Sequence, residues 1–341
     1  MKQVTLGTTG ITVPQNGFGA LPIQRVDMEQ AVKILRRAYE GGITFFDTAR
    51  AYSDSEEKLG NALADVREEI YIASKTMART PEEFKSQLET SLRLLKTDYI
   101  DIYQFHCVDV CYRPGDGTGM YECMLEAKEQ GKIRHIGVTA HKLNVAKECV
   151  ESGLYETLQY PLSYLSSEKE VELVEMCRER NMGFIAMKGL AGGLISRSQA
   201  AFAYMSQFEN VVPIWGVQKM EELEEWLGYM EDAPVLDEEI RAFIEKEKKE
   251  LTGEFCRGCG YCMPCPAGIK INNCARMSLM VRRAPSKDWL NEEWQESMKK
   301  IEDCLNCGQC MKKCPYELNT PELLKKNYED YKKILAGEIT V

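Results

Sequence analysis

Two runs of cysteine near the C-terminal end of this 341-residue chain have the types and spacing to do chemistry. The first run is Cys256, Cys259, Cys262 and Cys265, followed by Pro266, and the second is Cys304, Cys307, Cys310 and Cys314, followed by Pro315. Together they hold eight of the fourteen cysteines. Gaps of two residues let one turning loop deliver three thiolates to a single iron–sulfur cube. The runs therefore predict iron–sulfur clusters.

The second run has the spacing of bacterial ferredoxins, in which the fourth cysteine ligates the neighbouring cluster. We therefore expect two 4Fe-4S clusters with interleaved ligands. One set would be Cys256, Cys259, Cys262 and Cys314, and the other Cys304, Cys307, Cys310 and Cys265. The first run has two residues rather than three before its last cysteine, which leaves Cys274 as an alternative to Cys265.

Structural zinc sites and disulfides are the competing explanations. A structural zinc ion is bound by two Cys-x-x-Cys pairs, so a third and a fourth cysteine at the same spacing, followed by a proline, would have no role in a zinc site. The chain begins MKQVTLGTTG without a basic and then apolar leader, so we expect a cytoplasmic protein, in which disulfides are rare. Iron–sulfur clusters remain the preferred interpretation.

Composition excludes two classes of partner. Hydrophobic residues make up 44% and charged residues 28%, and no apolar run approaches the roughly 20 residues that cross a bilayer. A net charge of −10 without a local Lys/Arg cluster argues against nucleic-acid binding. We expect small molecules, or proteins with a basic docking face, as partners.

The distribution of cysteines suggests two domains. Five are scattered before residue 235 and nine lie after it. An acidic stretch, in which Leu236, Ile240, Phe243 and Ile244 recur at helical spacing, separates the two parts. We expect a large domain over residues 1–235, a linker helix over 236–253 and an iron–sulfur domain with a C-terminal tail over 254–341.

The large domain alternates short runs of β-branched and aromatic residues with amphipathic runs. The expected strands are residues 16–21, 43–47, 70–75, 99–106, 133–139, 157–160, 183–188 and 211–216. Asp27 and Thr80 are candidate helix N-caps, the latter in a capping box with Glu83. Eight strand–helix repeats predict a TIM-type (β/α)8 barrel. A doubly wound sheet is the alternative, but no Gly-x-Gly-x-x-Gly turn follows the first strand.

Three consecutive strands end in a charged or titratable residue, namely Asp47, Lys75 and His106. Taken alone, Asp47 could be a helix cap, Lys75 a charge at the rim of the barrel and His106 a histidine of the core. All three lie at carboxyl ends of strands, the face at which barrel enzymes keep their chemistry. They form a candidate active site.

In these segments the chain resembles the aldo-keto reductase family over nearly all of residues 1–230. The motifs are Leu6-Gly7-x-x-Gly10, Gly42-Ile43-Thr44-Phe45-Phe46-Asp47-Thr48-Ala49-x-x-Tyr52, Ser55-Glu56-x-x-Leu59-Gly60, Ser74-Lys75, Gln104-Phe105-His106 and Gly131-Lys132-Ile133-Arg134-x-Ile136-Gly137-Val138. The resemblance, to the subgroup with a C-terminal ferredoxin-type domain, implies a catalytic tetrad of Asp47, Tyr52, Lys75 and His106.

The chemistry of carbonyl reduction suits these four residues. Hydride addition leaves an alkoxide that must be protonated, and a tyrosine of pKa about 10 is a slow acid at neutral pH. Lys75 would lower the pKa of Tyr52, and Asp47 would hold Lys75. His106 would orient and polarise the substrate oxygen. The substrate would be a small carbonyl compound or alcohol.

The resemblance also implies a site for NADPH or NADH, with NADPH as the family expectation. The expected contacts are Gly19, Ala20, Thr139, Gln159, Met187, Lys188, Gly189, Leu190, Gly192, Gly193, Gly216, Gln218 and Lys219. Thr139-Ala140 replaces the usual Ser-Asn pair, and Met187 replaces a stacking tyrosine. Lys219 precedes an acidic run that makes a poor phosphate clamp.

The two halves of the chain handle electrons differently, because nicotinamide moves hydride and each cluster moves one electron. No flavin motif is visible, although a barrel can bind flavin without one. Three hypotheses follow: an NAD(P)H carbonyl reductase with structural or separately used clusters, a reductase fed by ferredoxin or a flavoprotein, and a non-catalytic electron-transfer module. The intact tetrad disfavours the third. The clusters together with the barrel lead us to expect an oxygen-sensitive cytoplasmic oxidoreductase from an anaerobic setting.

Helical signals over residues 274–281 and 292–301 predict a helical dicluster domain, with Trp289 and Trp294 packed in its core. The loop of residues 107–119 after His106 is expected to set substrate specificity. Cys107 and Cys111 in this loop could suggest a further metal site, but without a nearby histidine or carboxylate in metal-binding geometry they are expected to be pocket wall.

Overall fold

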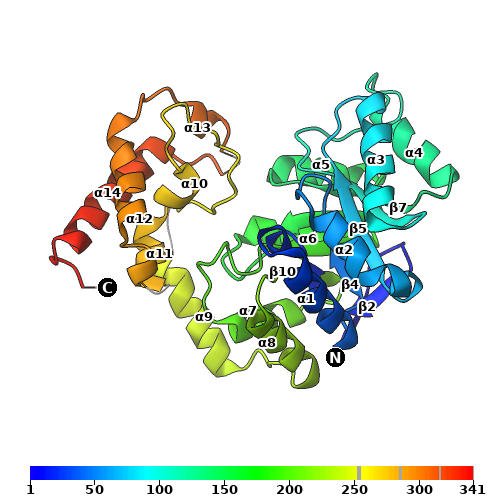
Figure 1. The fold of residues 1–341 in the computed structure, drawn as a ribbon, viewed down its shortest axis with the longest axis horizontal. Coiled ribbons are helices and arrows are strands. Elements are labelled where there is room, and N and C mark those ends of the chain that lie inside the picture. The colour runs from blue at the N-terminus through cyan, green and yellow to red at the C-terminus, as the bar shows by residue number, and fades with distance from the viewer. Residues whose placement is uncertain (252–254, 284–285, 315, 341) are drawn as a thin grey trace. The chain divides into compact units, whose positions relative to one another are not determined.

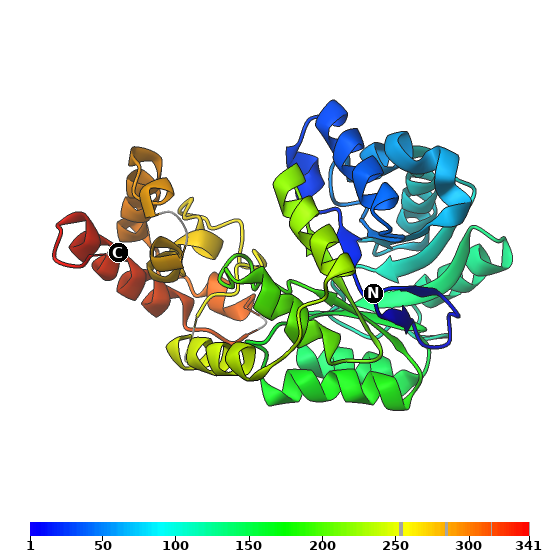
Figure 2. The ribbon, with the colours of Figure 1, turned by 90° about the horizontal axis from the view of Figure 1, so that it is seen from below.

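The computed structural model describes residues 1–251, 255–283, 286–314 and 316–340 (Figure 1, Figure 2). Pro315, and residues 252–254 at the expected end of the linker, lie outside the described residues. The chain divides into two compact units. Unit 1 consists of Met1–Gly189 and Phe202–Ile240, and unit 2 consists of Leu190–Ala201 and Arg241–Val341. The grouping of Leu190–Ala201 with the C-terminal part was not expected from the sequence.

Unit 1 contains a closed barrel of eight parallel strands, which confirms the predicted TIM-type fold. The strands are β3 (Gly17–Gly19), β4 (Phe45–Asp47), β5 (Tyr71–Thr76), β6 (Ile100–Phe105), β7 (Ile133–Thr139), β8 (Thr157–Pro161), β9 (Gly183–Met187) and β10 (Val211–Gly216). Each pairs with the next along the chain, and β10 returns to β3, so no sheet edge is left in the barrel. All eight predicted strands are present.

Helices follow the strands as the barrel requires. They are α1 (Met28–Glu40), α2 (Ser55–Leu63), α3 (Pro81–Leu95), α4 (Met120–Glu129), α5 (Leu143–Ser152), α6 (Glu168–Glu179), α7 (Ser198–Ser206) and α8 (Met220–Glu231). Asp27 caps α1 by accepting from the backbone N–H of Gln30, and Thr80 caps α3 in the same way. Glu83 accepts from the N–H of Arg79 rather than Thr80, so the expected capping box is shifted by one residue.

The amino end of the barrel is filled by an N-terminal hairpin of β1 (Gln3–Thr5) and β2 (Thr12–Pro14). Its apolar side chains share one core cluster with residues from the barrel strands: Val4, Leu6, Ile11, Val13, Phe45, Ala73, Ile102, Ile185, Val212 and Ile214. Burial of these side chains stabilises this end as a packed core rather than a pore. Polar chemistry is thereby confined to the carboxyl ends of the strands.

The regular secondary structure among the described residues of unit 2 is helical, and residues 255–270, which carry the first cysteine run, form a loop. Its helices are α9 (Glu238–Glu250), which begins in unit 1, and α10 (Ile271–Cys274), α11 (Met277–Arg283), α12 (Glu292–Lys299), α13 (Gln309–Lys312) and α14 (Thr320–Leu335). Helix α14 packs against α10, α11 and α13 (Figure 1). Trp289 and Trp294 pack against the core with ring centroids 5.0 Å apart, as predicted. Among the described residues, no helix is both long and apolar enough to span a membrane.

Candidate active site and cysteine pockets

A buried ion pair lies at the carboxyl ends of β4 and β5. The Nζ atom of Lys75 is 2.6 Å from Oδ1 of Asp47 and donates to the carbonyl oxygen of Thr48 at 2.6 Å. Lys75 is 1% exposed and Asp47 is 2% exposed. The strands β4 and β5 are parallel neighbours with Asp47 opposite Ala73, so Lys75 lies two residues further along β5, within reach of the carboxylate. Burial strengthens the attraction between the two charges while removing their hydration.

Two glutamines complete the surroundings of the carboxylate. Nε2 of Gln159 lies 3.4 Å from Oδ1 of Asp47, and Nε2 of Gln104 lies 3.5 Å from Oδ2. Gln104 also donates to Oε1 of Gln159 at 3.0 Å. Burial raises the pKa of Asp47, whereas Lys75 and the two amides act to lower it. Gln159, the expected carboxamide contact, thus engages the carboxylate of Asp47 here, and Gln104 joins a hydrogen-bond network that its motif alone did not indicate.

Tyr52 and His106 lie beside this pair. Lys75 Nζ is 5.1 Å from the centroid of the half-buried Tyr52 ring. The Tyr52 and His106 rings meet edge to face, with centroids 5.6 Å apart. The structure therefore brings together all four residues that the resemblance implied to be catalytic.

The pKa of Tyr52 differs from the sequence-based expectation. Burial raises it well above the ordinary value, and the negative charges of Asp47 and Cys107 raise it further. Lys75 faces the ring, and its charge is already balanced by Asp47. In this structure Tyr52 is held in the protonated form, which is the form that can donate a proton.

His106 follows β6 and is a neutral imidazole. Burial, assisted by the positive charges of Lys75 and Arg79, lowers its pKa to about 3. Its Nδ1 atom is buried, with no hydrogen-bond partner in the part of the chain that the structure describes. A buried, unsatisfied ring nitrogen next to Tyr52 is suited to interact with a substrate oxygen.

This low pKa predicts an unusual pH profile. Because His106 stays neutral down to a pH of about 3, we expect kcat/KM to show no histidine titration near pH 6.5, the unperturbed value. Loss of activity through protonation of His106 would begin only as the pH falls toward 3. The measurement is kcat/KM from steady-state kinetics between about pH 5 and 9. A step in kcat/KM near pH 6.5 that disappears in the His106→Gln variant would contradict the expectation.

A second histidine near the site was missed from the sequence. Nδ1 of His141 lies 3.7 Å from Sγ of Cys107, and burial together with the charge of Lys188 lowers the pKa of His141 well below its ordinary value. The expectation that no histidine lies near Cys107 is therefore wrong, since the loops after β6 and β7 bring the two residues together. Thr139 Oγ1 accepts from the backbone N–H of Cys107 at 2.7 Å, which orders the residue after His106.

Some expected nicotinamide contacts lie at strand ends in unit 1. The N–H of Ala20 donates to the carbonyl of Asp47 at 2.8 Å, directly after Gly19. Lys188 has a left-handed φ of 60° after Met187. Gly189 packs on Trp215, since a Cβ there would lie 2.5 Å from the indole ring.

The remaining contacts are less favourable to phosphate. Oε2 of Glu222 accepts from the backbone N–H groups of Gln218 and Lys219, at 2.9 and 3.2 Å. The two backbone N–H groups that precede α8 are therefore already hydrogen-bonded to a carboxylate. Gly216 is exposed next to Pro22. Leu190, Gly192 and Gly193 belong to unit 2.

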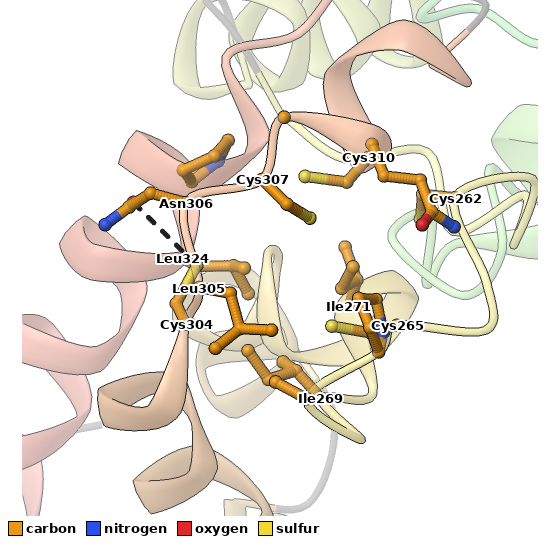
Figure 3. A pocket seen from close by; sticks show the side chains of 15 residues that line it. Cys262, Cys265, Ile269, Ile271, Cys304, Leu305, Asn306, Cys307, Cys310 and Leu324 are labelled. Carbon is orange, nitrogen blue, oxygen red and sulfur yellow. Dashed lines mark hydrogen bonds between the residues drawn. The ribbon is translucent and has the colours of Figure 1, made fainter.

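The cysteines of unit 2 line two pockets. One, of about 390 Å³, is lined by Cys262, Cys265, Cys304, Cys307 and Cys310. In Figure 3 the sulfur atoms of Cys265, Cys307 and Cys310 point into this space. The other, of about 320 Å³, is lined by Cys256, Cys259, Cys262 and Cys314. Each expected set of four ligands thus lines one pocket, and Cys262 lines both.

Cys274 lies elsewhere. It is completely buried in the core, its Sγ donates to the carbonyl of Ser297 at 3.7 Å, and it lines neither pocket. Cys265, in contrast, lies in the pocket wall with the second run.

The donor set of both pockets fits iron–sulfur clusters. Burial raises the pKa of Cys262 to about 12 and also raises those of Cys256 and Cys310, so these thiols need a cationic centre to become thiolates. Among the described residues, no three metal-binding side chains are close enough to share a single ion. A 4Fe-4S cube binds each thiolate at a different iron and so holds the four further apart than one zinc ion does.

Comparisons with known proteins agree with these features. A family model described as "Aldo/keto reductase family" matches residues 5–208, and one described as "4Fe-4S dicluster domain" matches residues 255–319. Probable aldo-keto reductase 1 of Glycine max is 29% identical over 215 residues, which are 57% of this chain and 60% of that relative. The chain thus spans three fifths of that protein's length.

Two further relatives bear on the barrel. The NADH-specific methylglyoxal reductase of Escherichia coli K12 is 28% identical over 58% of this chain and 69% of its own length. The holo form of an aldo-keto reductase from Bacillus halodurans has a TM-score of 0.65 and 26% identity, covering 72% of this chain and 96% of that one. The chain belongs to the aldo-keto reductase family and has a C-terminal 4Fe-4S dicluster domain.

Proposed function

We propose that the barrel catalyses NAD(P)H-linked reduction of a small carbonyl compound, or the reverse oxidation of an alcohol. The observation that carries this proposal is the buried Asp47–Lys75 pair with Tyr52 and His106 beside it. A curated relative, the Escherichia coli reductase, is named as NADH-specific. The cofactor, when bound, would supply the hydride.

The protein residues would supply proton transfer and orientation. Tyr52, kept protonated by burial and by Asp47, would donate its hydroxyl proton to the substrate oxygen as negative charge develops there. Neutral His106 would hold that oxygen and polarise the carbonyl. Lys75 would stabilise the tyrosinate left behind, and Asp47, held by two amides, would fix the position of Lys75.

We further propose two 4Fe-4S clusters in unit 2, with the interleaved ligands expected from the sequence. The pocket linings support this assignment and favour Cys265 over Cys274 as a ligand.

A second candidate function is reduction driven by ferredoxin or a flavoprotein through the clusters. Two observations favour it: Gln159 is engaged by Asp47 and Gln104, and Glu222 already caps the amides where a cofactor phosphate would bind.

An anaerobic assay separates the two functions. Protein with its full iron content would be mixed with NADH or NADPH and a panel of aldehydes and ketones, with reduced viologen as the alternative donor. Oxidation of the nicotinamide that depends on the carbonyl compound supports the first function. Turnover with viologen alone would overturn it.

Interleaved ligation predicts the iron content of two double variants. In Cys256→Ser/Cys314→Ser both changes affect one cluster, so about four iron atoms per chain should remain of about eight. In Cys304→Ser/Cys314→Ser both clusters lose a ligand, so little iron should remain.

Iron and sulfide analysis under anaerobic conditions measures the difference. The Cys274→Ala variant is the control and should keep about eight iron atoms. The reverse result for the two double variants would show that each run holds its own cluster.

A further inference from the structure

Arg276 is a buried cation in unit 2 that none of the proposed chemistry uses. It lies between α10 and α11 and is 8% exposed. Its Nη1 atom donates to the carbonyl oxygen of Gly192 at 2.9 Å. Its buried Nε atom has no hydrogen-bond partner within the described residues. The charged groups among those residues that act on Arg276 are Cys256 and Cys259, and no carboxylate is among them.

Two glycines make room for the guanidinium. A Cβ at Gly258 would lie 2.7 Å from Cζ of Arg276, and one at Gly192 would lie 2.7 Å from Nη1. Both glycines have a left-handed φ, of 65° and 67°. The guanidinium is therefore packed tightly against both backbones, and the hydrogen bond to Gly192 fixes its orientation.

Gly258 belongs to the loop of the first cysteine run. It lies between Cys256 and Cys259, and its N–H donates to Sγ of Cys256 at 3.4 Å. Burial lowers the pKa of Arg276, while Cys256 and Cys259 raise it. The guanidinium of an arginine stays charged in proteins. A buried positive charge that has no carboxylate partner needs another anionic neighbour.

The proposed cluster would provide that neighbour. A 4Fe-4S cluster with four thiolates carries a net negative charge, which increases by one unit when the cluster accepts an electron. A fixed positive charge nearby stabilises the reduced state more than the oxidised state. Local net charge is one of the factors that set the potentials of such clusters.

We propose that Arg276 is a positioning residue that raises the reduction potential of the cluster held by Cys256, Cys259, Cys262 and Cys314 above the value its ligands alone would give. The other cluster, held by Cys304, Cys307, Cys310 and Cys265, is not affected in this way. Reduction adds one electron to the cluster, from the chemical reductant in the test below, and makes or breaks no bond. At equilibrium, an electron that enters unit 2 would therefore reside preferentially on the cluster near Arg276.

The test is an anaerobic potentiometric titration of the full chain, with dithionite as reductant and the two clusters followed by electron paramagnetic resonance. The variant Arg276→Gln removes the charge but keeps an amide donor. Lys326→Gln removes the same charge from an exposed position on α14 of unit 2 and is the matched control. We expect Arg276→Gln to lower one potential, with about a tenfold smaller ratio of reduced to oxidised cluster at a fixed potential, or about 59 mV for one electron.

The second potential, and both potentials of Lys326→Gln, should match the unmodified protein. Two unchanged potentials in Arg276→Gln with its full iron content would overturn the proposal. If Arg276→Gln loses iron, Arg276→Lys decides: its shorter side chain cannot reach both glycines, so one potential should fall by a smaller amount, and no change would again overturn the proposal.

The inference rests on the cluster assignment proposed above. The two can fail separately, because iron and sulfide content tests the assignment and the potentials test the role of Arg276.

Discussion

Replacing Tyr52 with phenylalanine is expected to lower kcat for carbonyl reduction by about 1000-fold, with little change in KM. General acid catalysis by a positioned side chain contributes typically 10²- to 10⁴-fold. The hydroxyl is the group whose proton is held in place by burial and by Asp47. Its removal takes away an interaction made in the transition state and leaves the ring, which packs against His106, in place.

The matched control is Tyr71→Phe. Tyr71 begins β5, the strand that carries Lys75, but it packs at the opposite end of the barrel against the hairpin core. This variant should keep its activity within a few-fold. If Tyr52→Phe retains turnover at the level of the control, Tyr52 is not the proton donor.

The Lys75→Met variant is expected to lose both activity and stability. It leaves the carboxylate of Asp47 buried without its cation, and breaking a buried pair in this way costs about 3–5 kcal/mol. The amides of Gln104 and Gln159 are neutral and make long hydrogen bonds to Asp47, of 3.5 and 3.4 Å, so they cannot replace the charged partner at 2.6 Å. Urea denaturation followed by circular dichroism would measure the loss.

Two further variants show whether the loss comes from the unpaired charge. Lys33→Met removes an exposed partner of Glu29 and should cost less than about 1 kcal/mol. Asp47→Asn/Lys75→Met removes both charges and should recover part of the stability of Lys75→Met. An equal free energy of unfolding for Lys75→Met and Lys33→Met would contradict a strong interaction between Asp47 and Lys75 in the interior.

The barrel could be predicted from the sequence because its signals are local. Buried parallel strands appear as short apolar runs, and helices α1 and α3 begin at Asp27 and Thr80, where their caps were expected. Cysteine spacing predicted the two sets of residues that line the pockets of unit 2, since three members of each set come from one short loop.

Features that depend on distant parts of the chain could not be predicted. His141 meets Cys107 because neighbouring strands deliver the two loops to one place. The direction of the pKa shift of Tyr52 depends first on how deeply the folded chain buries its hydroxyl. The segment Leu190–Ala201 groups with unit 2 through contacts such as that of Gly192 with Arg276, which lie 84 positions apart.

The most direct test of the proposed function is to follow the transferred hydrogen. Protein with its full iron content would be incubated anaerobically with NADH or NADPH deuterated at C4 of the nicotinamide, together with a carbonyl substrate found in the assay. The account predicts one deuterium on the former carbonyl carbon of the alcohol, as shown by mass spectrometry, and formation of this product about 1000-fold more slowly with Tyr52→Phe. Alcohol formed without deuterium, and only when reduced viologen is present, would contradict it.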